Sequence, residues 1–534
     1  MTALFHELID RAAERAPDAV ALKHRRTTRT YAQLHAICQQ FAAGVVQLGL
    51  ARHDRVAVYL PKQLETIYAL FGTARAGCVF VPINPVLKPA QVRHILRDCN
   101  VRALVTSAER LANLADDLQE CPDLRHVILV DSPAAQSRPA RTPTYREHRW
   151  DSLLSAGSTN TSHRVIDADI AAILYTSGST GAPKGVVLSH RNLVAGAESV
   201  ASYLGNTSSD RLLAVLPLSF DYGLSQLSTA FHTGASVILL EHLFARDVIA
   251  AVAAEQITGL AAVPPLWTQL ANLPWPSSSS LRYITNSGGA MPSTTLQKLR
   301  AQLPAAQVFL MYGLTEAFRS TYLSPDQLDK RPGSIGKAIP GAEILVVRPD
   351  GSECAANEPG ELVHRGSSVA MGYWNAPALT AQRFRATPGR YAELSIAEVA
   401  VWSGDTVQRD EDGFLYFIGR QDEMIKTSGY RVSPTEIEEV ILQCGWVAEA
   451  VAFGIPHPAL GQAIAVLAVV SANRQPDTQA LLEVCRKHLP AFMVPTHLEW
   501  RSALPRNPNG KYDRKQLAVE LGATREHELA ERAP

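Results

Sequence analysis

The chain has 534 residues, enough for several domains or for one large domain with a smaller one. Hydrophobic residues make up 46% of it and charged residues 19%, the balance of a globular protein with an ample core. Lysine plus arginine and aspartate plus glutamate both number 51, which argues against a nucleic-acid binder that works by bulk electrostatics.

The first 130 residues alternate between helical and strand-like patterns. Helical periodicity occurs in three segments, 4–13, 31–48 and 63–77. Short strand-like runs lie between or after them, at 55–60, 79–82, 103–106 and 126–130. Strands that alternate with helices predict an α/β fold with largely parallel sheets. The stretch 132–163 is rich in Ser, Pro, Thr and Arg and is predicted to be an exposed connection.

A polar turn follows the apolar run 170–174, which is typical of a buried strand. Its sequence, YTSGSTGAPKG at 175–185, combines hydroxyl groups, three glycines and one lysine. Glycines let backbone N–H groups approach an anion closely, while the hydroxyls and Lys184 add donors. Pro183 stands where a Walker A loop needs its second glycine. The turn therefore predicts a different cradle for nucleotide phosphates, and the alternative is a Ser/Gly-rich surface loop.

The alternation then resumes and later gives way to a second kind of pattern. Strand-like runs recur at 212–216, 236–241, 259–263, 283–286 and 308–311. Residues 341–416 contain short strands with Gly and Asp-Gly turns, and we expect a small β region there. A change after Gly419-Arg420 predicts a large domain at 1–420 and a small separate domain at 421–534.

The cysteines and the apolar runs bear on the compartment. The seven cysteines are scattered, odd in number and without CxxC spacing, as in a cytoplasmic protein with reduced thiols. Residues 1–12 lack an apolar core of signal-peptide length, and the longest apolar run, Ala463 to Val470, is too short to span a bilayer. We therefore expect a cytoplasmic protein with no membrane span.

Five motifs in a fixed order carry a family resemblance. The phosphate turn fits [YF]-T-S-G-[ST]-T-G-x-P-K-G at every position. The other four are FLMYGLTE at 309–316, WSGD at 402–405, GRQDEMIK with GYRV at 419–432, and LPRNPNGK at 504–511. Together they resemble the adenylate-forming superfamily of acyl-CoA synthetases, peptide-synthetase adenylation domains and luciferases, over nearly the full length. The shorter segments LKP at 87–89, TNSGGA at 285–290 and EAFRS at 316–320 resemble one bacterial branch, the AMP-forming acyl-CoA ligases associated with exosortase systems.

The resemblance implies a fold and a reaction. The fold is a large N-terminal domain of two α/β subdomains plus a small β region, followed by a small mobile C-terminal α+β domain. A carboxylate attacks the α-phosphorus of ATP, pyrophosphate leaves, and the acyl-AMP then forms a thioester. The residues implied to hold ATP and AMP are Thr176, Ser177, Gly178, Ser179, Thr180, Gly181, Lys184, Gly288, Gly289, Ala290, Tyr312, Gly313, Asp405 and Arg420.

Individual roles follow from the same resemblance. Thr315 is expected on the α-phosphate, and Glu316 is expected to hold Mg²⁺, which prefers carboxylate and phosphate oxygens. Asp405 should accept hydrogen bonds from both ribose hydroxyls. Lys511 is expected to stabilise the adenylation transition state, and the alternative is an ordinary solvated lysine.

A hinge and a thiol-facing surface are also implied. Asp422 matches the hinge about which the small domain rotates after acyl-AMP forms, and the alternative is a helix cap or turn. The rotation brings Lys426 and Gly429, on the face at 426–432, to the active site, where a pantetheine thiol enters.

The acid pocket is assigned by alignment with peptide-synthetase adenylation domains. Its candidate walls are Asp221, Tyr222, Ser225, Ala262, Thr285, Ser287, Met311, Arg319 and Ser320. In those domains the aspartate pairs with the α-amino group of an amino acid, and the alternative for Asp221 is a structural residue near a turn. A buried Arg319 should meet a carboxylate, and its alternatives are a surface arginine or a structural salt bridge.

The leading hypothesis is an ATP- and Mg²⁺-dependent ligase that joins a small carboxylic acid to CoA through acyl-AMP. One alternative is a freestanding adenylation enzyme that loads an amino acid onto the phosphopantetheine of a carrier protein. Because no carrier domain follows Pro534, such a carrier would act in trans. A luciferase-like oxidase shares the motifs. A non-catalytic nucleotide-binding sensor would not need the lysine and hinge loops.

Overall fold

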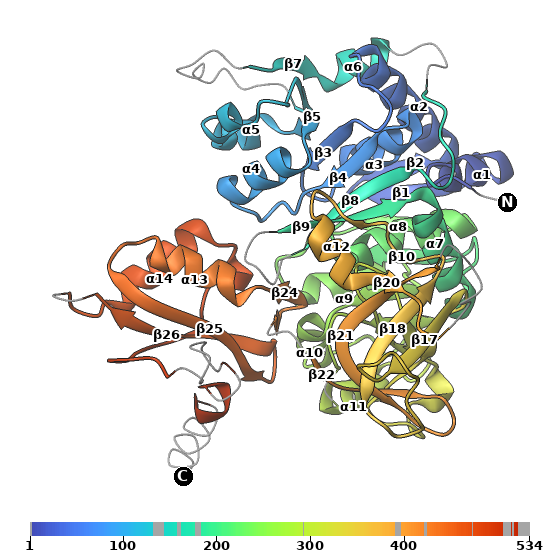
Figure 1. Ribbon diagram of the computed structural model, residues 1–534. Coiled ribbons are helices and arrows are strands. Elements are labelled where there is room, and N and C mark those ends of the chain that lie inside the picture. Colours follow the sequence, from blue (N-terminus) through green and yellow to red (C-terminus); the bar gives the residue numbers. More distant parts are fainter. Residues whose placement is uncertain are drawn as a thin grey trace.

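A large N-terminal domain and a small C-terminal domain make up the computed structural model, and the small domain stands to one side of the large one (Figure 1). The mixed α/β fold expected from the sequence is confirmed. The structure describes residues 3–131, 144–156, 162–176, 183–291, 293–389, 397–420, 424–471, 474–505, 514 and 517–521.

The first sheet of the large domain is mostly parallel. Its strands lie in the order β19 (Gly372–Tyr373), β9 (Lys184–Ser189), β8 (Ile170–Thr176), β4 (Val79–Pro82), β3 (Arg55–Tyr59), β5 (Val101–Thr106), β6 (His126–Leu129) and β7 (Arg146–Arg149). The strands from β8 to β7 are parallel, whereas β9 is antiparallel to both β8 and β19.

The second sheet joins the other α/β subdomain to the β region. Its order is β17 (Ala342–Val347), β18 (Gly360–Gly366), β21 (Val399–Arg409), β22 (Leu415–Arg420), β16 (Ser334–Ala338), β15 (Thr321–Leu323), β14 (Gln307–Tyr312), β13 (Tyr283–Asn286), β12 (Gly259–Ala262), β10 (Arg211–Ala214), β11 (Ser236–Leu239), β1 (Val20–His24) and β2 (Thr27–Thr30), with β20 (Phe384–Ala386) beside β21. The predicted β region thus continues this sheet, and the N-terminal hairpin β1–β2 completes its other edge.

Helices cover these sheets. They are α1 (Glu7–Arg15), α2 (Tyr31–Gln47), α3 (Leu64–Ala76), α4 (Pro89–Asp98), α5 (Ala108–Leu114), α6 (Trp150–Ala156), α7 (His190–Leu204), α8 (Asp221–Thr233), α9 (Ala245–Ala254), α10 (Pro264–Ala271), α11 (Ser293–Gln302) and α12 (Pro377–Arg383). The three helices expected at the N-terminus match α1, α2 and α3. Thr30 and Gln33 form a capping box that starts α2. No helix in the described ranges is both long and apolar enough to cross a bilayer.

The prediction of an exposed connection at 132–163 does not hold at 146–156. The chain forms β7 and α6 there. The reason is Trp150, whose ring packs against Phe41 and Tyr68 at centroid distances of 5.2 and 6.5 Å and anchors the polar segment to the core.

The small domain has its own sheet and core. Its strands are β24 (Tyr430–Val432), β23 (Ile425–Thr427), β26 (Gly461–Val470), β25 (Val447–His457) and β27 (His497–Trp500), and its helices are α13 (Pro434–Leu442) and α14 (Thr478–His488). Figure 1 shows both helices together on one face of β25 and β26. Gln91 of α4 in the large domain donates a hydrogen bond of 2.7 Å to Glu436 of α13 and links the two domains.

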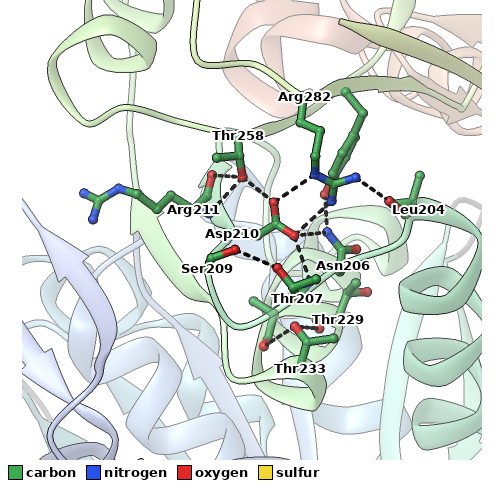
Figure 2. Close-up of polar contacts among 12 residues, drawn as sticks. Leu204, Asn206, Thr207, Ser209, Asp210, Arg211, Thr229, Thr233, Thr258 and Arg282 are labelled. Carbon is green, nitrogen blue, oxygen red and sulfur yellow. Dashed lines mark hydrogen bonds and ion pairs between the residues drawn. The ribbon is translucent and has the colours of Figure 1, made fainter.

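A buried carboxylate joins three neighbouring strands at their amino ends. Asp210, Thr258 and Arg282 directly precede the parallel strands β10, β12 and β13. Figure 2 shows Asp210 accepting hydrogen bonds from the Thr258 hydroxyl at 2.6 Å and from Arg282 Nη2 at 2.9 Å. The backbone N–H of Thr207 donates to the same carboxylate. Burial alone would raise the pKa of Asp210, but these donors and the Arg282 charge hold the pKa below its ordinary value.

Replacing Asp210 with alanine should lower the free energy of unfolding by about 3 kcal/mol at neutral pH, because Arg282 and Thr258 lose their acceptor. The pKa is lower in the folded state, so the stabilisation is present above the unfolded value of about 3.9 and is lost as pH falls through the folded value. Urea unfolding of both proteins from pH 7 to pH 3 measures this. Ser209→Ala, at an exposed residue, is the control. If the difference in free energy of unfolding between the wild type and Asp210→Ala does not become smaller in acid, the stabilising role of the Asp210 carboxylate is contradicted.

Candidate active site

A cavity of about 1540 Å³ lies between the carboxyl ends of the second sheet and the small domain. The segments that follow β13 and β14, residues 287–291 and 313–316, form part of its wall. In α/β sheets, ligands bind beyond the carboxyl ends of the strands, so the position fits a nucleotide site. Lys426, Gly429 and Arg431 of the small domain line the same cavity as Tyr312 and Glu316.

The phosphate side of the cavity begins where β8 ends. Thr176 and Lys184 line it at either end of the predicted phosphate turn, and the buried Thr176 hydroxyl has no hydrogen-bond partner among the residues that the structure describes. His94 of α4 contacts the carbonyl oxygen of Pro183 at 3.0 Å. Five predicted residues, Ser177, Gly178, Ser179, Thr180 and Gly181, lie outside the described ranges, and their roles stay predictions.

Lys184, Tyr373 and Glu316 form a compact polar cluster beside that turn. The Tyr373 hydroxyl donates to Glu316 Oε1 at 2.6 Å and accepts from Lys184 Nζ at 3.1 Å. Lys184 Nζ lies 3.6 Å from Glu316 Oε1 and 4.3 Å from the centre of the Tyr373 ring. Tyr373 therefore stands between a cation and a carboxylate and keeps both oriented toward the cavity.

Glu316 is ionised although it is buried. Burial alone would raise the pKa of this carboxyl, but the charges of Lys184 and Arg431 and the Tyr373 hydrogen bond lower the pKa to about 2. A buried, ionised carboxylate is a hard oxygen donor of the kind that Mg²⁺ prefers, so the donor chemistry fits the predicted metal role.

The sequence does not identify Tyr373 as a site residue, because its role depends on the pairing of two strands that lie far apart in the sequence. Its strand β19 pairs with β9 of the phosphate turn, with Tyr373 opposite Val186. The backbone N–H of Ala370 also donates to the Glu316 carbonyl oxygen at 2.9 Å. The only local signal is the sequence GYW at 372–374, which carries no recognisable chemistry on its own.

Replacing Tyr373 with phenylalanine should weaken the binding of metal with nucleotide about tenfold, because a hydrogen bond to an ionised group contributes about 1.5–3 kcal/mol. Electron paramagnetic resonance of free Mn²⁺, titrated with a non-hydrolysable ATP analogue, measures this without turnover. Tyr31→Phe is the matched control, since the buried Tyr31 hydroxyl bonds the Ala235 carbonyl far along the chain. Equal Mn²⁺ affinity in both variants would contradict the role.

Asp405, the predicted ribose acceptor, does not border this cavity, whereas the predicted adenine residues and Thr315 do. Gly288, Gly289, Ala290, Tyr312, Gly313 and Thr315 all line it. Asn286 donates to the Gly289 carbonyl oxygen at 2.9 Å and fixes the turn. The Tyr312 hydroxyl donates to the carboxylate of Asp405, which is fully buried on β21. The backbone of Arg420 pairs opposite Asp405, while its side chain lies outside the described atoms.

The predicted thiol-facing surface of the small domain closes directly on the large domain. Gly429 has φ +81°, and a Cβ added to it would lie 2.8 Å from Val263 Cβ. Its carbonyl oxygen would lie 3.5 Å from a Cβ added to Gly288. Lys426 Nζ lies 4.5 Å from the centre of the Phe417 ring. Asp422 and Lys511 are outside the described ranges, so the hinge and the catalytic lysine stay predictions.

The predicted acid-pocket residues are all buried, but they divide into three groups. Asp221, Tyr222, Ser287, Met311 and Arg319 line the cavity, and a hollow of about 10 Å³ beside it is bordered by Ser225 and Thr285. Ala262 and Ser320 border neither space. Ser320 instead contacts His364 Nδ1 at 3.0 Å. Arg319 donates from Nη1 to Asp221 Oδ2 at 2.8 Å, so the two charged candidates pair with each other.

The chain matches two family models and several known proteins. The models are the AMP-binding enzyme, over residues 9–374, and the AMP-binding enzyme C-terminal domain, over residues 436–511. It is 31% identical to a long-chain-fatty-acid–CoA ligase of Salmonella typhimurium, over 96% of this chain and 94% of that protein. It is 33% identical to a sulfoacetate–CoA ligase of Cupriavidus necator, over 88% of each.

One solved relative is known in two complexes. The o-succinylbenzoate CoA synthetase of Bacillus subtilis, as a double mutant with the product analogue OSB-NCoA, superposes with a TM-score of 0.81 at 25% identity, over 96% of this chain and 97% of that one. Its complex with AMP gives 0.67 at 26% identity over the same shares. With a family model that covers most of its length, the chain belongs to the AMP-binding enzyme family.

Proposed function

We propose that the protein is an ATP-dependent acid–thiol ligase, which converts a carboxylic acid to acyl-AMP and then to an acyl thioester of CoA. The observation that carries the proposal is the shared cavity. Nucleotide-side residues of the large domain and the Lys426–Arg431 loop of the small domain face one space. A nucleotide-binding sensor has no use for this second face. The relatives named above are CoA ligases, which supports the choice of acceptor.

The large domain would carry the first half-reaction. A carboxylate is a poor electrophile, and attack on the α-phosphorus of ATP gives it a good leaving group. Lys184 would hold the phosphates and the departing pyrophosphate, and Thr315 would contact the α-phosphate. Positioning and charge stabilisation supply most of the catalysis of such a transfer. Glu316 would hold Mg²⁺, which when bound neutralises phosphate charge.

The small domain would carry the second half-reaction after turning about a hinge at Asp422, the start of the 421–534 domain. The present arrangement has Lys426 and Gly429 at the cavity. The higher TM-score against the OSB-NCoA complex than against the AMP complex supports its assignment to the thioester-forming state. In this state the thiol of pantetheine would approach between the domains.

Acid-dependent exchange of pyrophosphate into ATP, followed by thioester analysis, tests the proposal. A panel of fatty, dicarboxylic and amino acids should contain at least one that drives exchange and, with CoA, yields acyl-CoA. The seven cysteines are all free, which supports work in a reducing compartment. Thioester formation only on an added phosphopantetheinylated carrier protein would favour the carrier-loading alternative. Oxidised product without thioester would favour the luciferase-like alternative.

A further inference from the structure

A buried ion pair forms one wall of the acid pocket. Asp221 is 6% exposed and Arg319 is 2% exposed, and both line the cavity that contains Glu316. Arg319 Nη1 lies 2.8 Å from Asp221 Oδ2. Because the two opposite charges meet within hydrogen-bond distance, this wall presents no net charge to an acid in the pocket.

The backbone on both sides holds the pair in place. Asp221 is the first residue of α8, where a carboxylate is stabilised by the amino end of the helix. Arg319 follows Phe318, which has φ +61°, a conformation that a bulky residue seldom adopts. Arg319 Nη1 also donates to the Phe318 carbonyl oxygen at 3.1 Å. A residue held in a left-handed conformation directs the guanidinium inward, so the pairing is built into the turn.

The rest of the guanidinium is enclosed by protein. Its carbon lies 4.4 Å from the centre of the Tyr222 ring and 5.0 Å from that of Phe318, both within cation–π range. Nε and Nη2 are buried and have no hydrogen-bond partner within the described part of the chain. The wall therefore consists of the Asp221–Arg319 pair, whose charges balance, with Nε and Nη2 still available as donors.

We infer that Arg319 occupies, from within the protein, the place that a substrate ammonium group would need beside Asp221, so that the enzyme selects acids without a charge at this wall. The inference rests on the proposed function, because it names the class of acid that the ligase activates. Met311 borders the same small hollow as Arg319 and Tyr222, and its apolar side chain suits an uncharged acyl group.

Each charged class of acid meets a specific obstacle. An α-ammonium group would have to displace Arg319 and leave a buried guanidinium without its carboxylate, which is strongly unfavourable. A second carboxylate would add an unbalanced negative charge to a buried neutral pair. An uncharged acyl group meets neither obstacle, and the neutral wall is retained.

Pyrophosphate exchange with matched acids tests the inference. One set is hexanoic, 2-aminohexanoic and hexanedioic acid, and another is 3-phenylpropanoic acid with phenylalanine. We expect the uncharged member of each set to exceed the charged members at least a hundredfold in kcat/KM. Arg319→Met releases Asp221 and should narrow the preference against the amino acids at least tenfold. The double variant Asp221→Leu/Arg319→Met keeps a neutral wall and should keep the wild-type order.

The outcomes separate the inference from the proposed function. A wild-type preference for the amino acids or for the dicarboxylic acid would overturn the inference and leave the ligase function in place. Exchange that is the same with and without every acid would overturn both. Thermal unfolding of each variant shows whether it is folded. If Arg319→Met does not fold, the wild-type order and the double variant decide: a double variant that gains the amino acids would overturn the inference.

Discussion

Replacing Lys511 with alanine should abolish acyl-AMP formation while thioester formation from supplied acyl-AMP largely survives. On the resemblance to the family motif, we propose that this lysine contacts the α-phosphate and the substrate carboxylate in the adenylating state. A transition-state charge contact of this kind contributes several kcal/mol, so pyrophosphate exchange should fall roughly a hundredfold or more. The two half-reactions are measured separately, by exchange and by acyl transfer from synthetic acyl-AMP to CoA.

Lys487→Ala is the matched control for Lys511→Ala. Lys487 lies in the last turn of α14 of the same small domain and is exposed. It should leave both half-reactions near their wild-type rates. Exchange at the wild-type rate in Lys511→Ala would refute the catalytic role, and an equal loss in both half-reactions would indicate damage to the domain.

Gly429→Leu should have the opposite effect to Lys511→Ala: it should impair thioester formation more than acyl-AMP formation. A side chain at this residue needs a φ of +81°, which favours glycine, and its Cβ would lie 2.8–2.9 Å from three carbons of Val263. The small domain could then not dock as it does here. Thioester formation should fall at least tenfold, and pyrophosphate exchange should fall much less because it uses the other domain arrangement.

Gly445→Leu is the control that separates the cost of a left-handed backbone conformation from the steric clash with Val263. Gly445 has φ +78° in the same domain, but no atom lies within 4 Å of a Cβ added to it. Both variants carry the same conformational penalty, and only Gly429→Leu meets the large domain. If the two variants lose thioester formation equally, the clash with Val263 is not the cause and the docking assignment is wrong.

Site residues could be predicted from the sequence where they directly follow a strand. The segments after β13 and β14 reach the cavity because parallel strands bring their carboxyl ends to one edge. Periodicity likewise located α2 and α3 closely, since long helices with an apolar face leave a strong signal. The family expected from the five motifs is confirmed by the models that match the chain.

Contacts between distant segments could not be predicted in this way. The pairing of Asp221 with Arg319 joins residues 98 positions apart, and each residue alone fits several roles. Tyr373 reaches Lys184 across 189 positions because β19 pairs with β9. The hairpin β1–β2 joins the second sheet through β11 for the same reason. Such partners depend on the packing of whole sheets, which single-sequence patterns do not encode.

Burial of Glu436, which accepts the hydrogen bond from Gln91 of the large domain, links docking of the small domain to proton uptake. Burial raises the pKa of Glu436 to about 7, above its ordinary value of 4.5. A carboxyl whose pKa is higher in the docked state takes up a proton on docking near neutral pH. Between the ordinary pKa of Glu436 and about 7, the docked state therefore loses about 1.4 kcal/mol of its advantage for each pH unit, and the loss levels off above about 7. A rise in pH toward 7 would lengthen the time that the enzyme spends undocked between its two half-reactions.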